Sequence, residues 1–309
     1  MSLRHATRLE TVSVRVPPAA ADAYEAAMGT ACGTVGCFID EATGEWVIEG
    51  VKPAGEGEAE LAGALALAAA VTGAAADLDR SDTPAEGWLA RSYSGFPEQR
   101  VGRRFVVRGT HLPDQASPAR ITLVLDAGVA FGSGEHGSTR GCLRAFEAVA
   151  HRHPRRVLDL GTGSGILAMA AARILCDAVI TAADIDPWSV RTAAENAGRN
   201  GVAQRIRFLR ADGWKSRAIR ADGPYDLVFA NILARPLCAM AAGLAANLAP
   251  GATAILSGLL APQARGVLAA HRREGLWLER RIGEGAWTTL VLRSAPTSRT
   301  RGDSPRGRP

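Results

Sequence analysis

Two glycine-rich segments of the 309-residue chain have the residue types of a nucleotide-binding loop. The downstream segment, 157–165, reads VLDLGTGSG, an apolar run that breaks at Gly161 and predicts a helix from Ile166 to Ile174. A strand, a tight glycine turn and a helix N-terminus leave backbone N–H groups free to contact a ligand. The upstream segment, 131–140, reads FGSGEHGSTR and could close over the same ligand. Together the two segments predict a site for a nucleotide-like cofactor.

The spacing of glycines and acids indicates the class of cofactor. Gly161, Gly163 and Gly165 form the pattern G-x-G-x-G. Ile166 stands where a dinucleotide fingerprint has its third glycine. Such a loop can also serve tight packing alone. Asp184 ends the next predicted strand, where a carboxylate can accept both hydroxyls of a ribose, and this position favours the nucleotide interpretation.

Asp159 lies inside the predicted strand, two residues before Gly161. A carboxylate there is costly to bury unless it accepts hydrogen bonds from the glycine-loop N–H groups or from a ligand amine. The cationic amino group or sulfonium of S-adenosylmethionine would favour this carboxylate, whereas a pyrophosphate would be repelled by it. Asp159 therefore favours S-adenosylmethionine as the cofactor over NAD.

Three polar residues follow the later predicted strands. Asp186, in the DIDP turn, fits a helix cap before Pro187 better than a ligand contact. Asp212 could accept from an adenine amino group or belong to an ordinary Asp-Gly turn. Asn231 ends the fourth strand, at the edge where a doubly wound sheet binds its ligand. Its amide could accept from an incoming amine and donate to a cofactor carboxylate, or it could cap the helix that begins near Arg235.

Strands and helices alternate from residue 155 onward, which predicts a parallel sheet with helices on both faces. The last two predicted strands, Trp277–Ile282 and Trp287–Arg293, have only Gly283–Gly285 between them and form a hairpin. We therefore expect an α/β class I methyltransferase fold, a Rossmann-like doubly wound sheet ending in an antiparallel hairpin. The other predicted strands are 101–108, 157–160, 179–183, 206–209, 227–230 and 252–257, with helices at 187–200, at 236–248 and ending near Glu274.

The first 80 residues predict a small α+β ferredoxin-like domain, because strands and helices follow in the order strand-helix-strand-strand-helix-strand. Its predicted elements are a strand at 9–16, a helix from Pro17 to Met28, a hairpin of 35–40 with 45–51, a helix at 58–71 and an edge strand beginning at 76–79. The expected division is a substrate-docking domain at 1–80, a turn-rich connector at 81–97, the methyltransferase domain at 98–293 and a disordered basic tail at 294–309.

The composition is that of an ordinary globular protein, with 47% hydrophobic and 22% charged residues. The net charge is +5, but the tail holds four arginines (Arg299, Arg301, Arg306 and Arg308) against Asp303, a net +3. The rest of the chain therefore carries about +2, which makes no strong case for nucleic-acid binding.

Other features of the sequence bear on where in the cell the protein is located and on whether it uses a membrane or a metal. The opening MSLRHATRLE lacks the apolar core of a signal peptide, and the most apolar run, 61–72, is too short to cross a bilayer. Five cysteines without a C-x-x-C pair predict free buried thiols in a reducing cytoplasm. The six histidines have no metal-ligand spacing. We expect a cytoplasmic protein that uses neither membrane nor metal.

Four segments in this order and spacing resemble the ribosomal protein L11 methyltransferases (the PrmA family): AFGSGEHGST, LDLGTGSGILAMAA, DIDPWSVRTAAENAGRNGV and ANILARPL. The resemblance covers roughly 101–293 and is specific, because ordinary S-adenosylmethionine domains lack both the FGSGEHGST and NILARPL segments. It implies cofactor contacts at Thr139, Gly161, Asp184 and Asn231, and a small N-terminal domain that docks the ribosomal protein.

The upstream loop departs from the family pattern G-T-G-x-H-P-T-T. Ser133 replaces the first Thr, Gly137 replaces the Pro and Ser138 replaces a Thr, whereas His136 and Thr139 remain. Loss of the proline predicts a loop with more freedom before ligand binds. The departure bears on turnover and affinity rather than on the fold.

The resemblance and the residues together predict transfer of methyl groups from S-adenosylmethionine to amino groups of ribosomal protein L11, either lysine side chains or the N-terminal amine. Positioning and exclusion of water supply the catalysis, so no strong base is required; His136 could carry protons away or only shape its loop. We expect a monomer that needs no direct contact with nucleic acid. The expected cofactor contacts are Thr139, Asp159, Gly161, Gly163, Asp184, Asp212 and Asn231, with Asn231 also the catalytic residue.

Three alternative functions stay open. A class I methyltransferase acting on another protein, RNA or a small amine would share every cofactor residue, although the weak body charge disfavours RNA. An NAD-dependent oxidoreductase fits the sheet but not the glycine spacing or Asp159. The third alternative is a binding module that keeps the fold but does not catalyse a reaction, which the altered upstream loop would allow.

Overall fold

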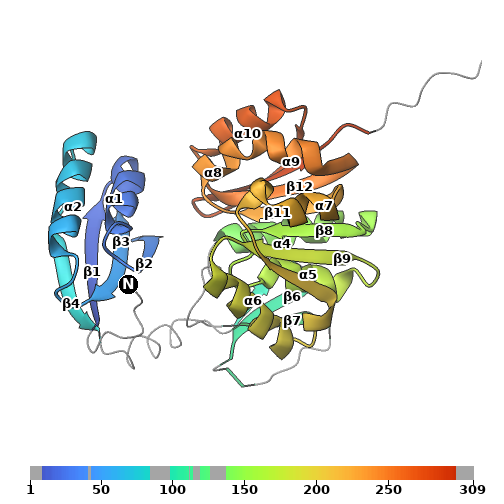
Figure 1. The fold of residues 1–309 in the computed structure, drawn as a ribbon, viewed down its shortest axis with the longest axis horizontal. Helices are drawn as coiled ribbons and strands as arrows, with labels where there is room; N and C mark the ends of the chain where they lie inside the picture. The colour runs from blue at the N-terminus through green and yellow to red at the C-terminus, as the bar shows by residue number, and fades with distance from the viewer. Residues whose placement is uncertain are drawn as a thin grey trace, which may run out of the picture. The chain divides into compact units, whose positions relative to one another are not determined.

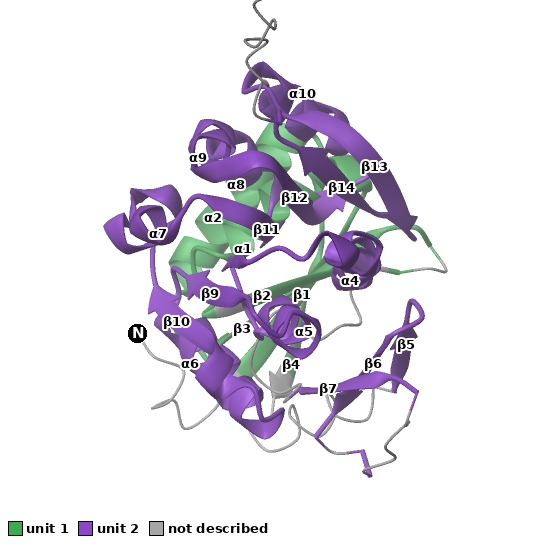
Figure 2. Cartoon of the chain, turned by 90° about the vertical axis from the view of Figure 1, so that its right-hand side faces the viewer, with its two compact units in different colours: residues 1–92 green, residues 93–309 purple. Residues whose placement is uncertain are grey.

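The computed structural model describes residues 9–40, 43–83, 98–110, 112–113, 119–125 and 137–296. The chain divides into two compact units, residues 1–92 and 93–309, coloured green and purple in Figure 2. We call them unit 1 and unit 2 and describe each by itself.

Unit 1 is a four-stranded antiparallel sheet with two helices (Figure 1). The sheet order is β2-β3-β1-β4, and every neighbouring pair is antiparallel. This arrangement is the split βαβ fold, so the predicted ferredoxin-like domain is confirmed. Its elements are β1 (Leu9–Val16), α1 (Ala21–Met28), β2 (Thr34–Ile39), β3 (Trp46–Pro53), α2 (Glu58–Thr72) and β4 (Leu78–Thr83). Strand β4 runs past residue 80, where we expected the domain to end.

The core of unit 1 follows from alternation along β1, where Val12, Val14 and Val16 are all buried. Helix α1 packs on α2 and adds Tyr24, whose hydroxyl donates to a backbone carbonyl after α2 at 2.6 Å. Helix α2 is apolar on its outer face as well, because Leu67 is 65% and Val71 74% exposed. Unit 1 therefore has its own core and an apolar helix surface that its own sheet does not cover.

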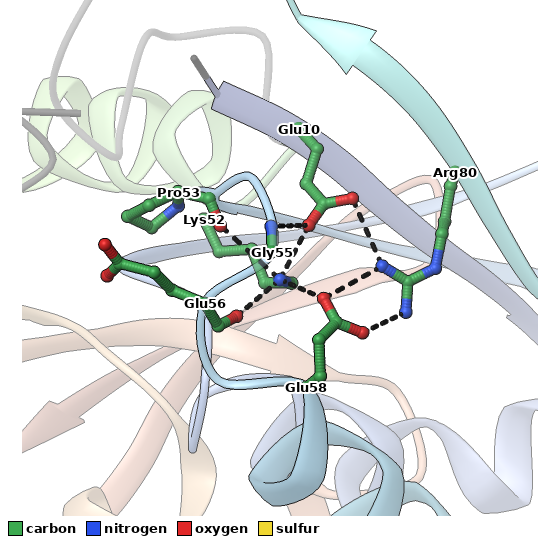
Figure 3. A network of polar contacts seen from close by, with 7 residues as sticks. All are labelled: Glu10, Lys52, Pro53, Gly55, Glu56, Glu58 and Arg80. Atoms are coloured by element: carbon green, nitrogen blue, oxygen red, sulfur yellow. Dashed lines mark hydrogen bonds and ion pairs between the residues drawn. The ribbon is translucent and has the colours of Figure 1, made fainter. Parts of the chain in front are cut away.

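Lys52 is a fully buried cation in unit 1, surrounded by oxygen atoms (Figure 3). Its ammonium group donates to the Glu56 carbonyl and the Glu58 carboxylate, each at 2.5 Å, and pairs with Glu10 at 2.6 Å. Arg80 contacts the same two carboxylates, Glu10 at 3.1 Å and Glu58 at 2.6 Å. Hydrogen bonds from Arg80 and Lys52 lower the pKa of Glu58 to about 2. This network ties β1, β4 and the β3–α2 loop together.

Unit 2 contains a seven-stranded sheet in the order β10-β9-β8-β11-β12-β14-β13 (Figures 1 and 2). Strands β8 to β12 are parallel, and β14 and β13 are antiparallel. The predicted doubly wound sheet with a final hairpin is confirmed. Its strands are β8 (Arg156–Leu160), β9 (Val179–Asp184), β10 (Ile206–Arg210), β11 (Tyr225–Asn231), β12 (Leu248–Leu260), β13 (Trp277–Glu284) and β14 (Trp287–Arg293).

Helices cover both faces of this sheet, and the strands bury successive side chains in opposite cores. Val157 of β8 lies in one core, with residues of α4 (Gly137–Val149), α5 (Ile166–Ile174) and α6 (Pro187–Arg199). Leu158, the next residue, lies in the other core. The helices that contribute to this second core are α7 (Arg217–Asp222), α8 (Ala234–Ala239), α9 (Ala241–Asn247) and α10 (Ala264–Arg273). Continuous apolar strands such as β8 are buried on both sides for this reason.

The structure corrects the single strand predicted at 101–108. The chain instead turns at Gly102, which has φ +57°, between β5 (Gln99–Val101) and β6 (Phe105–Gly109). The Glu147 carboxylate accepts the backbone N–H groups of Arg103 at 3.1 Å and Arg104 at 2.6 Å, which fixes this turn. Strand β7 (Ile121–Leu125) completes a separate three-stranded sheet.

Two helices also differ from prediction. The helix expected at 236–248 is divided at Met240 into α8 and α9, and the sequence pattern missed the short α7. The expected connector at 81–97 begins with the end of β4 at Thr83, and its residues from 84 to 97 lie outside the described ranges. Of the expected tail at 294–309, the described part ends at Pro296.

All five cysteines are free, as predicted, but only Cys142 is buried and Cys176 is exposed. Among the helices that the structure describes, none is long and apolar enough to cross a membrane.

Candidate functional site

The predicted site residues lie at the carboxyl ends of the parallel strands of unit 2. The chain order reverses between β8 and β11, since β9 and β10 follow on one side of β8 and β11 lies on the other. In doubly wound sheets the ligand crevice forms at this reversal. The glycine loop leaves β8 and Asn231 ends β11, so both flank the crevice.

The glycine loop adopts backbone conformations that favour glycine. Gly161, Gly163 and Gly165 have φ of +72°, +52° and +84°. The N–H groups of Gly161 and Thr162 both donate to the carbonyl of Ala183 on β9, at 2.8 and 3.0 Å. A Cβ at Gly165 would lie 3.0 Å from the Ala193 Cα of α6, so α6 packs directly on the loop. The loop is therefore fixed by β9 and α6 before any ligand binds.

Asp159 is a fully buried carboxylate directly beneath this loop. Its Oδ2 accepts the Thr162 hydroxyl at 2.7 Å and the Ala168 N–H of α5 at 3.1 Å. Its Oδ1 is buried and makes no hydrogen bond with the part of the chain that the structure describes. Burial raises the pKa of Asp159 to about 6, against the two hydrogen bonds and with a smaller contribution from the charge of Asp184. A buried anionic oxygen without a partner suits a cationic ligand.

Asp184, at the end of β9, faces the loop. Its Oδ2 accepts the Gly163 N–H at 3.0 Å, and its Oδ1 accepts the Asp186 N–H at 3.0 Å. Asp186 caps α6, because its carboxylate accepts the N–H groups of Trp188 and Ser189 at 3.1 and 3.0 Å. Burial raises the pKa of Asp186, but the hydrogen bonds from Trp188 and Ser189 outweigh it and lower the pKa below its ordinary value. The predicted capping role of Asp186 agrees with this geometry.

Asp212 follows β10 at the same edge, next to Asp184, whose carbonyl accepts the Ala211 N–H at 2.7 Å. The turn is an Asp-Gly turn in which Gly213 has φ +50°. The Asp212 carboxylate is half exposed and pairs with Lys215 at 2.8 Å. Hydrogen bonding and the charge of Asp212 raise the pKa of Lys215. The turn and a ligand contact are compatible, since a surface pair of this kind is weak.

Asn231 and Thr139 lie together on the other side of the crevice. The Asn231 side-chain amide donates to the Thr139 hydroxyl oxygen at 3.4 Å, and Thr139 is fully buried in the first turn of α4. Asn231 does not cap the following helix, because α8 begins at Ala234 with Leu233 as its cap residue and without a side-chain cap. The alternative role of Asn231 as a helix cap is therefore wrong.

Sequence reasoning missed the residues that hold Asn231 in place. Ile232 fills the space at Gly161, where a Cβ would lie 2.3 Å from the Ile232 Cγ2. A Cβ at Gly258, which has φ +78°, would lie 2.4 Å from the Ile232 carbonyl. Ser257, paired with Asn231 across β11 and β12, donates to the Ser138 carbonyl at 3.2 Å. The sequence signal for these residues was the polar residue that interrupts an apolar strand end, in ANIL at 230–233 and in LSGLL at 256–260.

The altered upstream loop is only partly visible. Ser133 and His136 lie outside the described residues, while Gly137 and Ser138 begin α4. A Cβ at Gly137 would lie 2.5 Å from the Glu284 carbonyl in the β13–β14 turn. A residue larger than glycine would therefore displace this hairpin, which gives a physical reason for the departure from proline.

These groups fit S-adenosylmethionine. The Asp159 Oδ1, which has no partner among the described residues, suits the cationic end of the cofactor, and glycine-loop N–H groups and the Asp184 carboxylate suit a nucleoside. The Asn231 amide and Thr139 hydroxyl supply neutral polar atoms beside them. Within the described ranges, no cluster of three His, Cys, Asp or Glu side chains could hold a metal ion.

Comparison with known proteins agrees with this geometry. The profile of the family described as ribosomal protein L11 methyltransferase (PrmA) matches residues 48–295. The ribosomal protein L11 methyltransferase of Rhizobium meliloti (strain 1021) is 47% identical over 216 residues, which are 70% of this chain and 74% of that protein. The protein of that name from Bradyrhizobium diazoefficiens is 47% identical over 210 residues, 68% of this chain and 70% of its own.

A solved structure gives the same result. The crystal structure of a ribosomal protein L11 methylase from Lactobacillus delbrueckii subsp. bulgaricus matches with a TM-score of 0.58 and 29% identity. The match covers 64% of this chain and 98% of that chain. The chain therefore belongs to the ribosomal protein L11 methyltransferase family and is an enzyme that transfers methyl groups from S-adenosylmethionine.

Proposed function

We propose that the enzyme methylates amino groups of ribosomal protein L11, on lysine side chains, on the N-terminal amine or on both. The names of the relatives support this substrate. The observation that carries the mechanism is the 3.4 Å contact between Asn231 and Thr139 at the carboxyl edge of the sheet. It supports a role for this non-titrating amide in holding the methyl acceptor, since the next residue, Ile232, packs against Gly161 of the glycine loop.

The cofactor, when bound, supplies a methyl group on a positively charged sulfur. Asp184 is proposed to accept the ribose hydroxyls, because its carboxylate already lies 3.0 Å from the Gly163 N–H. Gly161 and Gly163 let the ligand approach the backbone closely. Asp159 stabilises the cationic end through its Oδ1, which has no hydrogen-bond partner among the described residues, and Asp212 accepts from the adenine amino group.

The acceptor amine must lose its proton before it attacks. A lysine has a pKa of about 10.4 and an α-amine of about 8, and desolvation beside a positive charge lowers either. Asn231 accepts from the neutral amine and holds its lone pair along the methyl–sulfur axis. The new N–C bond forms as the S–C bond breaks, and the extra proton leaves the product amine for solvent. Alignment and exclusion of water supply the rate, without a strong base.

Unit 1 is proposed to dock the ribosomal protein. It holds none of the cofactor residues but has its own buried core. The exposed Leu67 and Val71 of α2 support an interaction with a large partner, because apolar side chains grouped on one helix face favour protein contacts. We further propose a cytoplasmic monomer that needs no nucleic acid for methyl transfer.

The test uses radiolabelled S-adenosylmethionine with purified ribosomal protein L11, an unrelated basic protein, total RNA and free lysine as parallel acceptors. Label should enter ribosomal protein L11 at least tenfold faster than any other acceptor, and mass spectrometry should place it on amines. Label in RNA or free lysine at an equal rate would overturn the proposed substrate. If no acceptor becomes labelled although the protein still binds S-adenosylmethionine, the result would favour a binding module.

A further inference from the structure

Among the described residues of unit 2, large apolar side chains stay exposed at Val179, Ile185, Leu233 and Trp277. Single exposed apolar residues are ordinary on a protein surface, so only their positions give them meaning. Val179 begins β9 and Trp277 begins β13, both at the amino edge of the parallel strands. Ile185 directly follows Asp184, on the side of the proposed ribose contact. Leu233 follows Asn231 by two residues, on the side where the methyl acceptor is proposed to bind.

The backbone that carries Leu233 is fixed on both sides. Before it, Ile232 packs between two glycines, since a Cβ at Gly161 would lie 2.3 Å from the Ile232 Cγ2 and one at Gly258 2.4 Å from the Ile232 carbonyl oxygen. After it, α8 begins, and the Leu233 carbonyl accepts the Leu237 N–H at 3.2 Å. The Leu233 side chain is nevertheless 53% exposed. An apolar side chain is therefore held at the crevice, and about half of its surface is left for a ligand to cover.

Leu233 lies within reach of an amine that Asn231 holds. Two residues of chain span at most about 7 Å, so the Cα atoms of Asn231 and Leu233 are no further apart than this. The Asn231 amide is itself fixed by its 3.4 Å contact with the Thr139 hydroxyl. A leucine side chain neither donates nor accepts a hydrogen bond. Its contribution beside the acceptor is therefore apolar contact and the exclusion of water.

The two classes of amine in a protein differ in what lies next to the nitrogen. A lysine nitrogen ends a stem of four methylene groups, which gains free energy when it packs on a leucine. An α-amine is bonded to a Cα whose neighbour is a peptide carbonyl. That carbonyl would lose its hydrogen bond to water against the same leucine. A leucine beside the acceptor nitrogen therefore favours a lysine side chain.

We propose that Leu233 is a specificity-determining residue that contacts the methylene stem of the substrate lysine and favours lysine side chains over the N-terminal amine. The inference rests on the proposed function, because it names the preferred amine of that same reaction. Asn231 holds the lysine nitrogen, and Leu233 packs on the carbon atoms behind it. One side of the neutral amine is thereby shielded from water when it meets the methyl group.

The test follows methylation of purified ribosomal protein L11 by the full chain, with mass spectrometry giving separate initial rates at lysine side chains and at the α-amine. The ratio of the two rates within one acceptor protein cancels docking and cofactor binding. Lysines should be methylated faster by the wild-type enzyme. Leu233→Ala should lower the ratio of lysine to α-amine methylation at least fivefold. Leu233→Met should restore it to within twofold, because methionine supplies a similar apolar volume.

Matched controls separate loss of the contact from loss of folding. Leu233 is the cap residue of α8, and Asn is a better helix cap than Leu. Leu233→Asn should therefore keep or raise the melting temperature and yet lower the ratio as much as Leu233→Ala does. Val179→Ala removes an exposed apolar side chain at the opposite edge of the sheet and should leave the ratio unchanged.

Three results would overturn the proposal. The first is a wild-type ratio in Leu233→Ala, including an equal loss of rate at both classes of amine. The second is a wild-type enzyme that methylates the α-amine faster than lysines. The third is a wild-type enzyme that labels no amine of ribosomal protein L11, in which case the proposed function fails as well. This third result is distinct from the first two, because it is seen before any variant is compared.

Discussion

Asn231 and Thr139 are 92 residues apart in the sequence, yet their side chains meet at 3.4 Å. Thr139 is held by α4, and Asn231 by its register opposite Ser257 on β12. The Ser257 hydroxyl also contacts the Ser138 carbonyl at 3.2 Å, next to Thr139. One side of the crevice is therefore fixed by a link between α4 and two strands.

Asn231→Ala is expected to reduce turnover more than cofactor affinity, because the amide aligns the acceptor as well as the cofactor. Steady-state kinetics with ribosomal protein L11 and calorimetry with S-adenosylmethionine separate the two effects. Thr139→Val should act partly through Asn231, so the double variant should lose less than the sum of both. Equal losses in turnover and affinity would reduce Asn231 to a cofactor contact.

Asp184→Ala is expected to weaken S-adenosylmethionine binding about ten- to a hundredfold. Hydrogen bonds to a charged group contribute about 1.5–3 kcal/mol, and the same change frees the Gly163 N–H. Asp186→Ala is the matched control, since it removes the α6 cap, lowers stability by about 1 kcal/mol and leaves the affinity unchanged. Calorimetry that finds wild-type affinity in a folded Asp184→Ala protein would contradict the ribose assignment.

Asp159 should make stability without cofactor depend on pH. Its pKa is raised to about 6, so the native state binds the proton more tightly than the unfolded chain. Stability should therefore fall as pH rises from about 4 to 6, by roughly 3 kcal/mol, and stay level above that range. Asp159→Asn should remove this dependence in urea unfolding, and its S-adenosylmethionine affinity should no longer fall below pH 6. If the Asp159→Asn variant kept the wild-type dependence of stability on pH, Asp159 would not be the group that causes it.

Lys52→Met is expected to destabilise unit 1 by about 3 kcal/mol, because it leaves two carboxylates near one partly exposed arginine. Arg80→Met should cost less, since the Arg80 side chain is 41% exposed. Urea unfolding of both variants, followed by tryptophan fluorescence, measures the difference. If Lys52→Met is the milder change, the buried ammonium is not what holds the network together.

A fragment that begins at Tyr93 should fold and bind S-adenosylmethionine within about threefold of the full chain, a difference below roughly 0.7 kcal/mol. Both cores of unit 2 and every predicted cofactor residue lie after this point. The fragment should lose methylation of intact ribosomal protein L11. If it methylates that protein as fast as the full chain, the docking role of unit 1 is wrong.

The elements with strong local signals could be predicted from the sequence. Helix α5 has the predicted bounds, because Gly165 and the apolar run after it mark its start. The Asp186 cap follows from Asp before Pro, a pattern that acts within one turn. The edge that carries the site followed from strand order alone.

Features that depend on long-range packing could not be predicted. The turn at Gly102 is fixed by Glu147, which lies far along the chain, so the apolar pattern of 101–108 resembles one strand. The contact between Thr139 and Asn231 depends on the register of α4 against β12. The cavity lined by Arg152, Thr253 and Arg293 gathers side chains from several separate segments, and none of them contains a recognisable motif.

Strand β11 carries Asp226 near its amino end and Asn231 at the crevice, about 17 Å apart along the backbone. It is hydrogen-bonded to β8 on one side and β12 on the other, so its two ends keep a constant separation. The position of Asn231 is therefore set by both neighbouring strands. A ligand that enters the crevice therefore meets an amide that is already in position, and its binding requires no rearrangement of β11.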